Sequence, residues 1–273
     1  MTRLEYKNVT MQFPDSGGGK AVTAIQNVSF AIADGEVVSL IGPSGCGKST
    51  LLNIGAGLYS PAAGEAHVDG ARVQGPNEHV AFMLQKDLLL PWRTIAENVM
   101  FGLEIRGVPY AQRLKRAVEL LSNFHLKEFC DHYPHQLSGG MRQRAALART
   151  LAVDPTVLLL DEPFSAVDAQ TRIMLQHDLA QTLMSTRKTA LLITHDILEA
   201  VILSDRVLVM SRRPGTIVEE IRIDIPDRAN PLARRKHPNV AGYISLMMDR
   251  LEIVPPSAGA VSSASSSATG MRP

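Results

Sequence analysis

The part of the chain best suited to bind phosphate is a glycine-rich segment at residues 42–50, Gly-Pro-Ser-Gly-Cys-Gly-Lys-Ser-Thr. Glycines let consecutive backbone N–H groups turn toward one anion, and a helix that starts at Lys48 would add its positive end. In such a loop the lysine reaches the β- and γ-phosphates, and the hydroxyl of Ser49 binds Mg²⁺. The sequence therefore predicts a site for ATP and Mg²⁺. The residues assigned to the nucleotide are Gly42, Pro43, Ser44, Gly45, Cys46, Gly47, Lys48, Ser49 and Thr50.

Two adjacent carboxylates, Asp161 and Glu162, end an apolar run at residues 156–161. If this run is a strand of the same sheet, both side chains lie at its carboxyl edge, beside the phosphate-binding loop. Asp161 then holds Mg²⁺ through its water shell, and Glu162 orients or deprotonates the attacking water. An aspartate at a strand end is otherwise a common turn residue, but the following glutamate and Pro163 favour the catalytic interpretation.

A second candidate anion site is the segment Ser138-Gly139-Gly140, which precedes a helical pattern. A helix N-terminus carries free N–H groups and a positive dipole end, so it attracts phosphate. Ser138 is also a good ordinary N-cap, and the two roles are compatible. Two glycines in the first turn weaken a helix unless something approaches its backbone closely, and the γ-phosphate of ATP is the expected neighbour.

The elements around these motifs alternate between apolar strands and helical patterns. Strands are expected at residues 4–13, 24–32, 36–41, 156–161, 189–194 and 206–210, and helices at residues 48–54, 111–124, 138–151 and 169–184. The first two strands flank the glycine-rich turn at residues 14–19 and read as an antiparallel hairpin. The later strands are apolar throughout, as in a parallel sheet covered on both faces. The predicted fold is an α/β phosphate-loop NTPase with a mixed sheet.

Composition narrows the function classes. The chain of 273 residues has 28 basic and 27 acidic residues, so no net field favours nucleic acid or an anionic membrane surface. Its two cysteines, Cys46 and Cys130, do not suggest a disulfide framework, and Cys46 lies inside the phosphate-binding loop. A reducing cytoplasm is therefore expected. No secretion signal is recognised, and no apolar run reaches the ~18 residues of a membrane span.

Taken together, these motifs resemble the nucleotide-binding subunits of ABC transporters over residues 3–215. The resemblance implies an ATPase with an antiparallel β subdomain and an inserted helical subdomain. It also assigns roles by position to four further residues. Gln85 senses Mg²⁺ and the γ-phosphate, His195 contacts the γ-phosphate, Asp168 crosses a dimer interface and Phe13 stacks on adenine. Without the stronger motifs, His195 would read as an ordinary strand-end residue and Phe13 as part of the core.

With the resemblance included, the expected catalytic residues are Lys48, Gln85, Glu162 and His195. The expected Mg²⁺ ligands are Ser49, Gln85 and Asp161. Met141 and Val167 depart from the commonest family pattern, but neither change removes a group assigned to phosphate chemistry.

Further segments resemble the importers of nitrate, sulfonates and taurine, and those of thiamin precursors. They lie at residues 88–92, 97–99, 139–143, 161–164 and 213–215. In that subgroup residues 88–99, which include Trp92, line the groove that accepts a helix of the membrane permease. The alternative is that these apolar residues belong to the core of the helical subdomain.

The resemblance implies a mechanism in which two copies pair head to tail, each ATP lying between one phosphate-binding loop and the other copy's Ser138 segment. The expected partners are thus a second copy, an integral membrane permease and, indirectly, an extracytoplasmic solute-binding protein. The chain is expected at the cytoplasmic face of the inner membrane. The alternatives weighed are a soluble ABC ATPase of DNA repair or translation and a phosphate-loop kinase. The sequence shows one cassette, no long heptad run and nearly balanced charge, which disfavours the first alternative. A kinase would need an acceptor pocket and a lid, and would have no use for the Ser138 segment together with His195.

The expected domain organisation follows from the motif positions. The nucleotide-binding core with its antiparallel subdomain covers residues 1–85 and 153–225, and the helical subdomain covers residues 86–152. A C-terminal extension at residues 226–254 and a disordered Ser/Ala/Gly-rich tail at residues 255–273 complete the chain.

Overall fold

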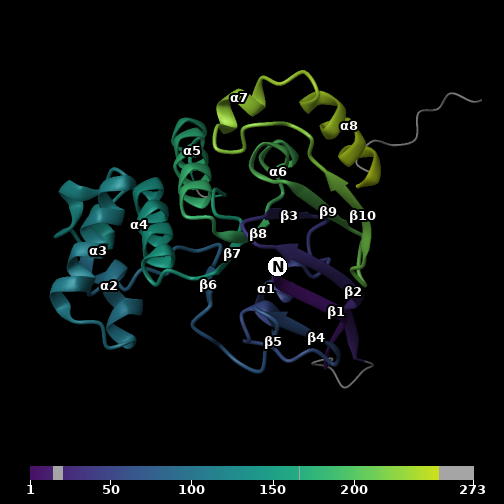
Figure 1. Ribbon diagram of the computed structural model, residues 1–273, viewed down its shortest axis with the longest axis horizontal. Helices are drawn as coiled ribbons and strands as arrows, with labels where there is room; N and C mark the ends of the chain where they lie inside the picture. The colour runs from purple at the N-terminus through teal and green to yellow at the C-terminus, as the bar shows by residue number, and fades with distance from the viewer. Residues whose placement is uncertain (15–20, 166, 252–273) are drawn as a thin grey trace, which may run out of the picture.

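An antiparallel four-stranded sheet is built largely from the N-terminal part of the chain (Figure 1). We describe it from a computed structural model that covers residues 1–14, 21–165 and 167–251. The strands are β1 (Thr2–Phe13), β2 (Val22–Ala33), β4 (Ala63–Val68) and β5 (Ala71–Arg72), in the order β2-β1-β4-β5. The predicted hairpin is confirmed, since β1 pairs antiparallel with β2; most of its turn lies outside the described residues.

The second sheet has six strands in the order β10-β9-β3-β8-β7-β6. These are β3 (Val37–Ile41), β6 (Val80–Met83), β7 (Val157–Asp161), β8 (Thr189–Ile193), β9 (Arg206–Met210) and β10 (Ile217–Arg222). All neighbours are parallel except β10, which runs antiparallel to β9. Because β3, β7 and β8 are buried along their whole length, their sequences are continuously apolar rather than alternating.

Helices cover both sheets, and three of them form a separate group at one side (Figure 1). The helices are α1 (Lys48–Gly55), α2 (Ile95–Ile105), α3 (Tyr110–Asn123), α4 (Gly139–Ala152), α5 (Ala169–Ser185), α6 (Ile197–Leu203), α7 (Pro231–Arg235) and α8 (Val240–Arg250). Two short 3₁₀ turns, Lys127–Phe129 and Pro134–Gln136, connect α3 to α4. We call the part from α2 to α4 the helical segment; it lies between β6 and β7 in the chain.

Three apolar clusters hold these layers together. One lies between the two sheets and includes Tyr6, Leu51 and Leu159; the Tyr6 hydroxyl donates a hydrogen bond of 2.8 Å to the Leu51 carbonyl of α1. A second joins the opposite face of the six-stranded sheet to α5 and the helical segment. A third lies under α6 and α8 and contains Met247. The phosphate-binding loop is thus fixed to the most buried part of the fold.

The expected elements are found, but four strands were not predicted. The β4 segment, Ala-Gly-Glu-Ala-His-Val, alternates too weakly to be recognised, while β5 and β6 are short and β10 carries two consecutive glutamates. The described part of residues 226–254, expected to be a C-terminal extension, contains α7 and α8. The expected disordered tail at residues 255–273 lies outside the described residues. Among the helices that the structure describes, none is long and apolar enough to cross a membrane.

Candidate active site

The phosphate-binding loop connects β3 to α1, as the sequence predicts. Gly45 and Gly47 adopt left-handed backbone conformations, with φ of 76° and 107°. A side chain at Gly47 could not be accommodated, because its Cβ would lie 2.3 Å from Cγ2 of Ile25 on β2. Glycine is therefore required here by both backbone conformation and packing.

A cavity of about 300 Å³ opens over this loop and the start of α1. It is lined by Ser44, Gly45, Gly47, Lys48, Ser49, Thr50, Glu162 and Arg213. The Lys48 ammonium donates hydrogen bonds to the carbonyls of Gly42, at 2.8 Å, and Pro43, at 3.1 Å. A cationic group, a helix N-terminus and left-handed glycines thus meet at one small cavity, an arrangement suited to a polyphosphate.

Asp161 is the last residue of β7, and its side chain is largely buried beside the loop. Burial raises the pKa of the Asp161 carboxyl above its ordinary value, and the adjacent Glu162 adds to the rise. A hydrogen bond with Ser49 and the charge of Lys48 oppose this effect. A buried carboxylate that faces a hydroxyl and an ammonium is well placed to bind a cation.

Three of the predicted catalytic residues meet, with Glu162 between Gln85 and His195. The Glu162 carboxylate accepts a hydrogen bond of 2.9 Å from the Gln85 amide and lies 3.3 Å from Nδ1 of His195. Gln85 follows β6, Glu162 follows β7 and His195 follows β8, and these strands are parallel neighbours in the sheet. Their carboxyl ends therefore bring the three side chains to one edge. The N–H of Glu162 still pairs with the carbonyl of Ile193 on β8, but its φ of 47° ends the extended conformation of β7.

The oxygen ligands at this edge fit Mg²⁺. Ser49, Asp161 and Gln85 offer hydroxyl, carboxylate and amide oxygens, which are the hard ligands that Mg²⁺ prefers. Within the described ranges, no cluster of three His, Cys, Asp or Glu side chains forms a metal site by itself.

Ser138 and Asp168 are helix N-caps. The Ser138 hydroxyl accepts a hydrogen bond of 3.3 Å from the N–H of Met141, at the start of α4. Asp168 accepts hydrogen bonds from two N–H groups in the first turn of α5, and the Thr171 contacts lower the pKa of its carboxyl. Gly140 has a neighbour within the chain, because a Cβ there would lie 2.8 Å from Cγ2 of Thr171. Close packing between α4 and α5 thus favours glycine at position 140, a constraint that the sequence did not reveal.

The second anion site does not line the cavity at the phosphate-binding loop of the same chain. Ser138, Gly139 and Gly140 lie at the start of α4, in the helical segment, whereas α1 lies between the two sheets (Figure 1). The two segments predicted to bind phosphate therefore lie apart within one copy.

Phe13 ends β1 and makes an edge-to-face contact with Tyr59, with ring centroids 5.8 Å apart. It is half-buried, and Tyr59 is 42% exposed, so the pair is not part of the apolar core. The core interpretation of Phe13 is thereby disfavoured, and the adenine role stays a prediction.

Several polar residues near the site were not given a role from the sequence. Arg149 of α4 donates to the carbonyl of Leu88 at 2.7 Å, and Arg142 of α4 pairs with Asp87 at 3.1 Å, so the segment after Gln85 is tied to α4. Arg213 lines the cavity at the phosphate-binding loop, although its segment was noted only as a subgroup feature. Arg213 follows β9, a direct neighbour of β3, so the strand order of the folded sheet is what brings it to the loop.

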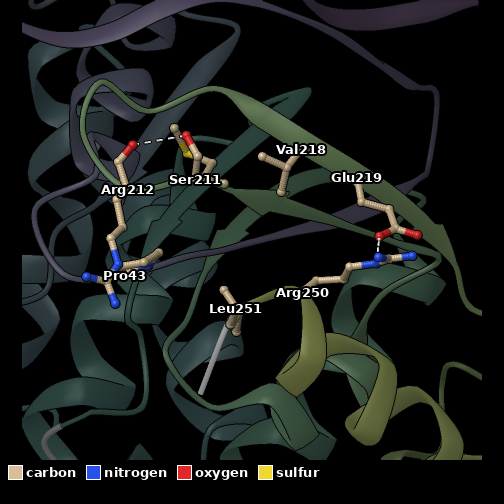
Figure 2. A pocket seen from close by; sticks show the side chains of 8 residues that line it. Pro43, Ser211, Arg212, Val218, Glu219, Arg250 and Leu251 are labelled. Carbon is tan, nitrogen blue, oxygen red and sulfur yellow. Dashed lines mark hydrogen bonds and ion pairs between the residues drawn. The ribbon is translucent and has the colours of Figure 1, made fainter. Parts of the chain in front are cut away.

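A larger cavity of about 790 Å³ lies between β10 and the end of α8 and is not lined by Asp161 or Glu162 (Figure 2). It is lined by Pro43, Met210, Ser211, Arg212, Val218, Glu219, Arg250 and Leu251. Only Pro43 belongs to the predicted nucleotide site, so this cavity is not where the expected chemistry converges.

Comparison with known proteins agrees with this geometry. The family described as "ABC transporter" matches residues 25–165. An uncharacterized ABC transporter ATP-binding protein of Methanocaldococcus jannaschii is 45% identical over 223 residues, covering 82% of this chain and 83% of its own length. The taurine import ATP-binding protein TauB of Yersinia pestis is 47% identical, covering 75% of this chain and 80% of its own length. TauB of Pseudomonas entomophila is 42% identical, covering 84% and 86%, respectively.

A solved structure is also similar to this fold. The dimeric ATP-binding cassette MJ0796 bound to ADP and Pi is 33% identical, has a TM-score of 0.73, and covers 81% of this chain and 99% of its own. The matching family, the relatives and the geometry of the phosphate-binding loop lead to one conclusion: this chain belongs to the ABC transporter family and is one of its ATP-hydrolysing subunits.

Proposed function

We propose that this ATPase drives an importer of small sulfonates of the taurine type, from the cytoplasmic face of the membrane and through an integral permease. The relatives named for taurine import are 42–47% identical over at least 75% of this chain. The wider subgroup suggested by the sequence also includes importers of nitrate and thiamin precursors. A permease and a binding protein would select the transported solute. Sequence identity within the ATPase therefore supports the importer class more strongly than it supports taurine as the solute.

The observation that carries the permease part of the proposal is a group of exposed apolar side chains near the helical segment. Leu84, Leu88, Trp92 and Ile105 are 39%, 53%, 71% and 72% exposed. Leu89, only one residue from Leu88, is buried in the core. Single exposed apolar residues are ordinary, but four within 22 positions are typical of a docking surface. We call them the exposed apolar group.

Ile105 of this group also lines a cavity of about 450 Å³ formed by β6, the edge strand of the six-stranded sheet, and the helices α2 and α4. Its apolar lining comes from Phe82, Phe101 and Ile105, among others. We propose that a short helix of the permease occupies it. Arg142 and Arg149 join the segment after Gln85 to α4. A displacement of α4 by the permease helix would therefore be transmitted to Gln85, which contacts Glu162.

We further propose that two copies pair head to tail, as the two segments predicted to bind phosphate lie apart within one copy. In that pair the N-terminus of α4 in one copy would approach the γ-phosphate held by the other copy's phosphate-binding loop. Asp168 would lie close to the interface, and Phe13 would stack on adenine. The dimeric state of the MJ0796 cassette, 33% identical to this chain, supports the pairing.

In the closed pair, Glu162 would accept a proton from the attacking water. Its present partners, Gln85 and His195, would turn toward the γ-phosphate, and Lys48 would exchange the carbonyls of Gly42 and Pro43 for phosphate oxygens. Mg²⁺ would be held by Ser49, Asp161 and Gln85, and would neutralise charge on the leaving phosphates.

The test is affinity purification of the tagged chain from gently detergent-extracted native membranes, followed by mass spectrometry. Recovery of one multi-span permease is expected, and a binding protein that accompanies it can then be tested with taurine and other sulfonates. The control is Lys48→Ala, which keeps the exposed apolar group and should recover the same permease. Recovery of soluble partners alone from well-extracted membranes would reject the importer and favour an ABC ATPase of DNA repair or translation.

A further inference from the structure

The turn at residues 211–216 contacts the phosphate-binding loop, and its Arg213 lines the rim of the nucleotide cavity. The turn follows β9, and the Arg213 guanidinium donates two hydrogen bonds to the carbonyl of Gly45, at 3.1 Å from Nε and 2.9 Å from Nη2. Two donors of one planar cation thus hold one carbonyl, which fixes the carbonyl's direction better than a single bond.

The direction of this carbonyl matters because the peptide group is planar. The Gly45 carbonyl and the N–H of Cys46 belong to the same peptide, so holding one orients the other. Gly45 is in the left-handed region, where glycine changes conformation at little steric cost. The N–H of this peptide donates to the Pro43 carbonyl at 3.3 Å, so the peptide is held at both ends. Without Arg213 only this long internal bond would remain, and the peptide could turn and change the loop's shape around the anion.

The turn itself is held rigidly. The Ser211 N–H donates to the Thr216 carbonyl at 2.9 Å, and the Thr216 N–H donates to the Ser211 hydroxyl at 3.0 Å. Gly215 then binds β2 on both sides, because its N–H donates to Ala24 at 2.9 Å and its carbonyl accepts from Gln26 at 3.0 Å. A Cβ at Gly215 would lie 2.0 Å from the Cys46 carbonyl, so the turn is pressed against the loop.

We propose that Arg213 is a positioning residue for ATP binding: it fixes the Gly45–Cys46 peptide so that the phosphate-binding loop is organised before ATP arrives. This rests on the ATPase activity of the family and not on the proposed importer role. The neighbouring Arg212 offers a matched control. It carries the same charge in the same turn and lines cavities beside Pro43 and His195 (Figure 2), but among the described residues its side chain makes no hydrogen bond to the phosphate-binding loop.

The experiment compares Arg213→Gln, Arg213→Lys and Arg212→Gln in the otherwise unchanged chain. For Arg213→Gln, the KM for ATP should rise on the order of tenfold, the effect of losing one charge-assisted hydrogen bond. The kcat at saturating ATP should fall much less, because Lys48, Glu162 and His195 are unaltered. Arg213→Lys should be intermediate, since lysine restores one donor but not the fork. Arg212→Gln should behave as the wild type.

Hydrogen exchange of the nucleotide-free protein separates positioning from direct contact with ATP. The backbone amides of residues 42–50 should exchange faster in Arg213→Gln than in the wild type. The exchange rates of the six-stranded sheet and the melting temperature should stay unchanged. If KM rises without faster exchange, Arg213 acts on the nucleotide itself and the proposal is wrong. It is also wrong if Arg213→Gln and Arg212→Gln have equal effects. Should Arg213→Gln fail to fold, the same comparison is made with Arg213→Lys.

Discussion

Glu162 is the residue on which the catalytic assignments converge. Its carboxylate contacts Gln85 and His195, and its backbone is turned by a left-handed φ of 47°. Such a conformation is uncommon for a non-glycine residue, and it directs Glu162 away from the path of β7. Asp161, one position earlier, faces Ser49 and Lys48 instead. Two adjacent carboxylates thus have separate neighbours, which supports separate roles in binding the cation and in handling water.

Replacing Glu162 by glutamine should stop hydrolysis while leaving ATP binding intact. The amide cannot accept the proton of the attacking water, so kcat should fall by about 10²–10⁴-fold. An ATP-bound dimer should then accumulate, as measured by light scattering with ATP and Mg²⁺. The control is Glu119→Gln, because Glu119 is an exposed residue of α3. If Glu162→Gln stays monomeric or keeps its kcat, Glu162 is not the base.

Glu199 offers a pH-dependent test of a buried carboxyl away from the chemistry. It is 4% exposed in α6, and the amide of Gln176 donates a hydrogen bond of 2.9 Å to it. Burial is the main cause that raises the pKa of Glu199, and the hydrogen bonds from Thr194 and Gln176 only partly oppose it. A carboxyl with a raised folded-state pKa stabilises the fold below its unfolded pKa, about 4.3, and this stability is lost as the pH rises through the folded pKa.

Glu199→Gln should therefore raise the melting temperature near pH 8 relative to the wild type, and the gain should vanish near pH 4. A glutamine keeps the acceptor for Gln176 and avoids the burial of a charge. Each unit of pKa elevation corresponds to about 1.4 kcal/mol, and about 1 kcal/mol shifts the melting temperature by roughly 2–4 °C in a domain of this size. Glu119→Gln, measured by the same calorimetry, should show no such trend. A gain equal at both pH values would contradict the assignment.

At the scale of elements, the loop between β6 and α2 is held in place by one buried side chain. Asn98 of α2 is fully buried and donates to the carbonyls of Leu90, Arg93 and Thr94, while its own oxygen accepts from the N–H of Leu90 at 2.7 Å. One side chain thus holds a loop that has no strand or helix to satisfy its backbone. This rigid loop is what leaves Trp92 on the surface.

Trp92→Ala should separate ATP binding from coupling to the permease. Trp92 is 71% exposed and contributes little to the core, so stability and the Kd for ATP should stay within twofold of the wild type. A buried tryptophan at an interface typically contributes about 2 kcal/mol or more to binding, so affinity for the permease should fall at least tenfold. The measurement is transport and ATPase activity in reconstituted vesicles. Leu232→Ala on α7, which also removes an exposed apolar side chain, is the control; equal effects would remove Trp92 from the docking surface.

At the scale of the whole molecule, the structure separates two groups that would act on one phosphate. The phosphate-binding loop precedes α1 between the sheets, and Ser138 begins α4 in the helical segment (Figure 1). Neither group can complete the other within one copy as described. This separation is the structural reason for which we propose catalysis in head-to-tail pairs.

Mixing two inactive variants tests this pairing. Lys48→Ala removes the phosphate ligand, and Gly139→Asp places a negative charge where the γ-phosphate of the other copy would lie. Both should be inactive alone. In an equal mixture of head-to-tail pairs roughly a quarter of the sites are intact, by random pairing of subunits, so a comparable share of activity should return. Ala111→Asp, which adds the same charge to the first turn of α3, is the control and should stay active. No recovery on mixing would contradict the head-to-tail arrangement.

The sequence predicted the phosphate-binding loop and the main strands because their signals are local. The strands β3, β7 and β8 are continuous apolar runs, and the loop motif is contiguous. The strands β4 and β10 were missed because partners elsewhere in the chain, β1 and β9, stabilise weak local patterns. Among residues 88–99, Leu89 lies in the core, as the core interpretation expects, whereas Trp92 is exposed and its docking role stays a prediction. Only the fold could separate two apolar residues so close in sequence.

By itself, the sequence determined which residues could bind ATP, because the spacing of Gly45, Gly47 and Lys48 is fixed by consecutive peptide bonds. It also identified Glu162 and, through the family resemblance, Gln85 and His195. Only the tertiary structure decided that these three side chains meet, although Gln85 lies 77 residues from Glu162. The same holds for Arg213, which reaches Gly45 across 168 residues. The physical reason is the strand order, since parallel strands that are distant in sequence end side by side at one edge of the sheet.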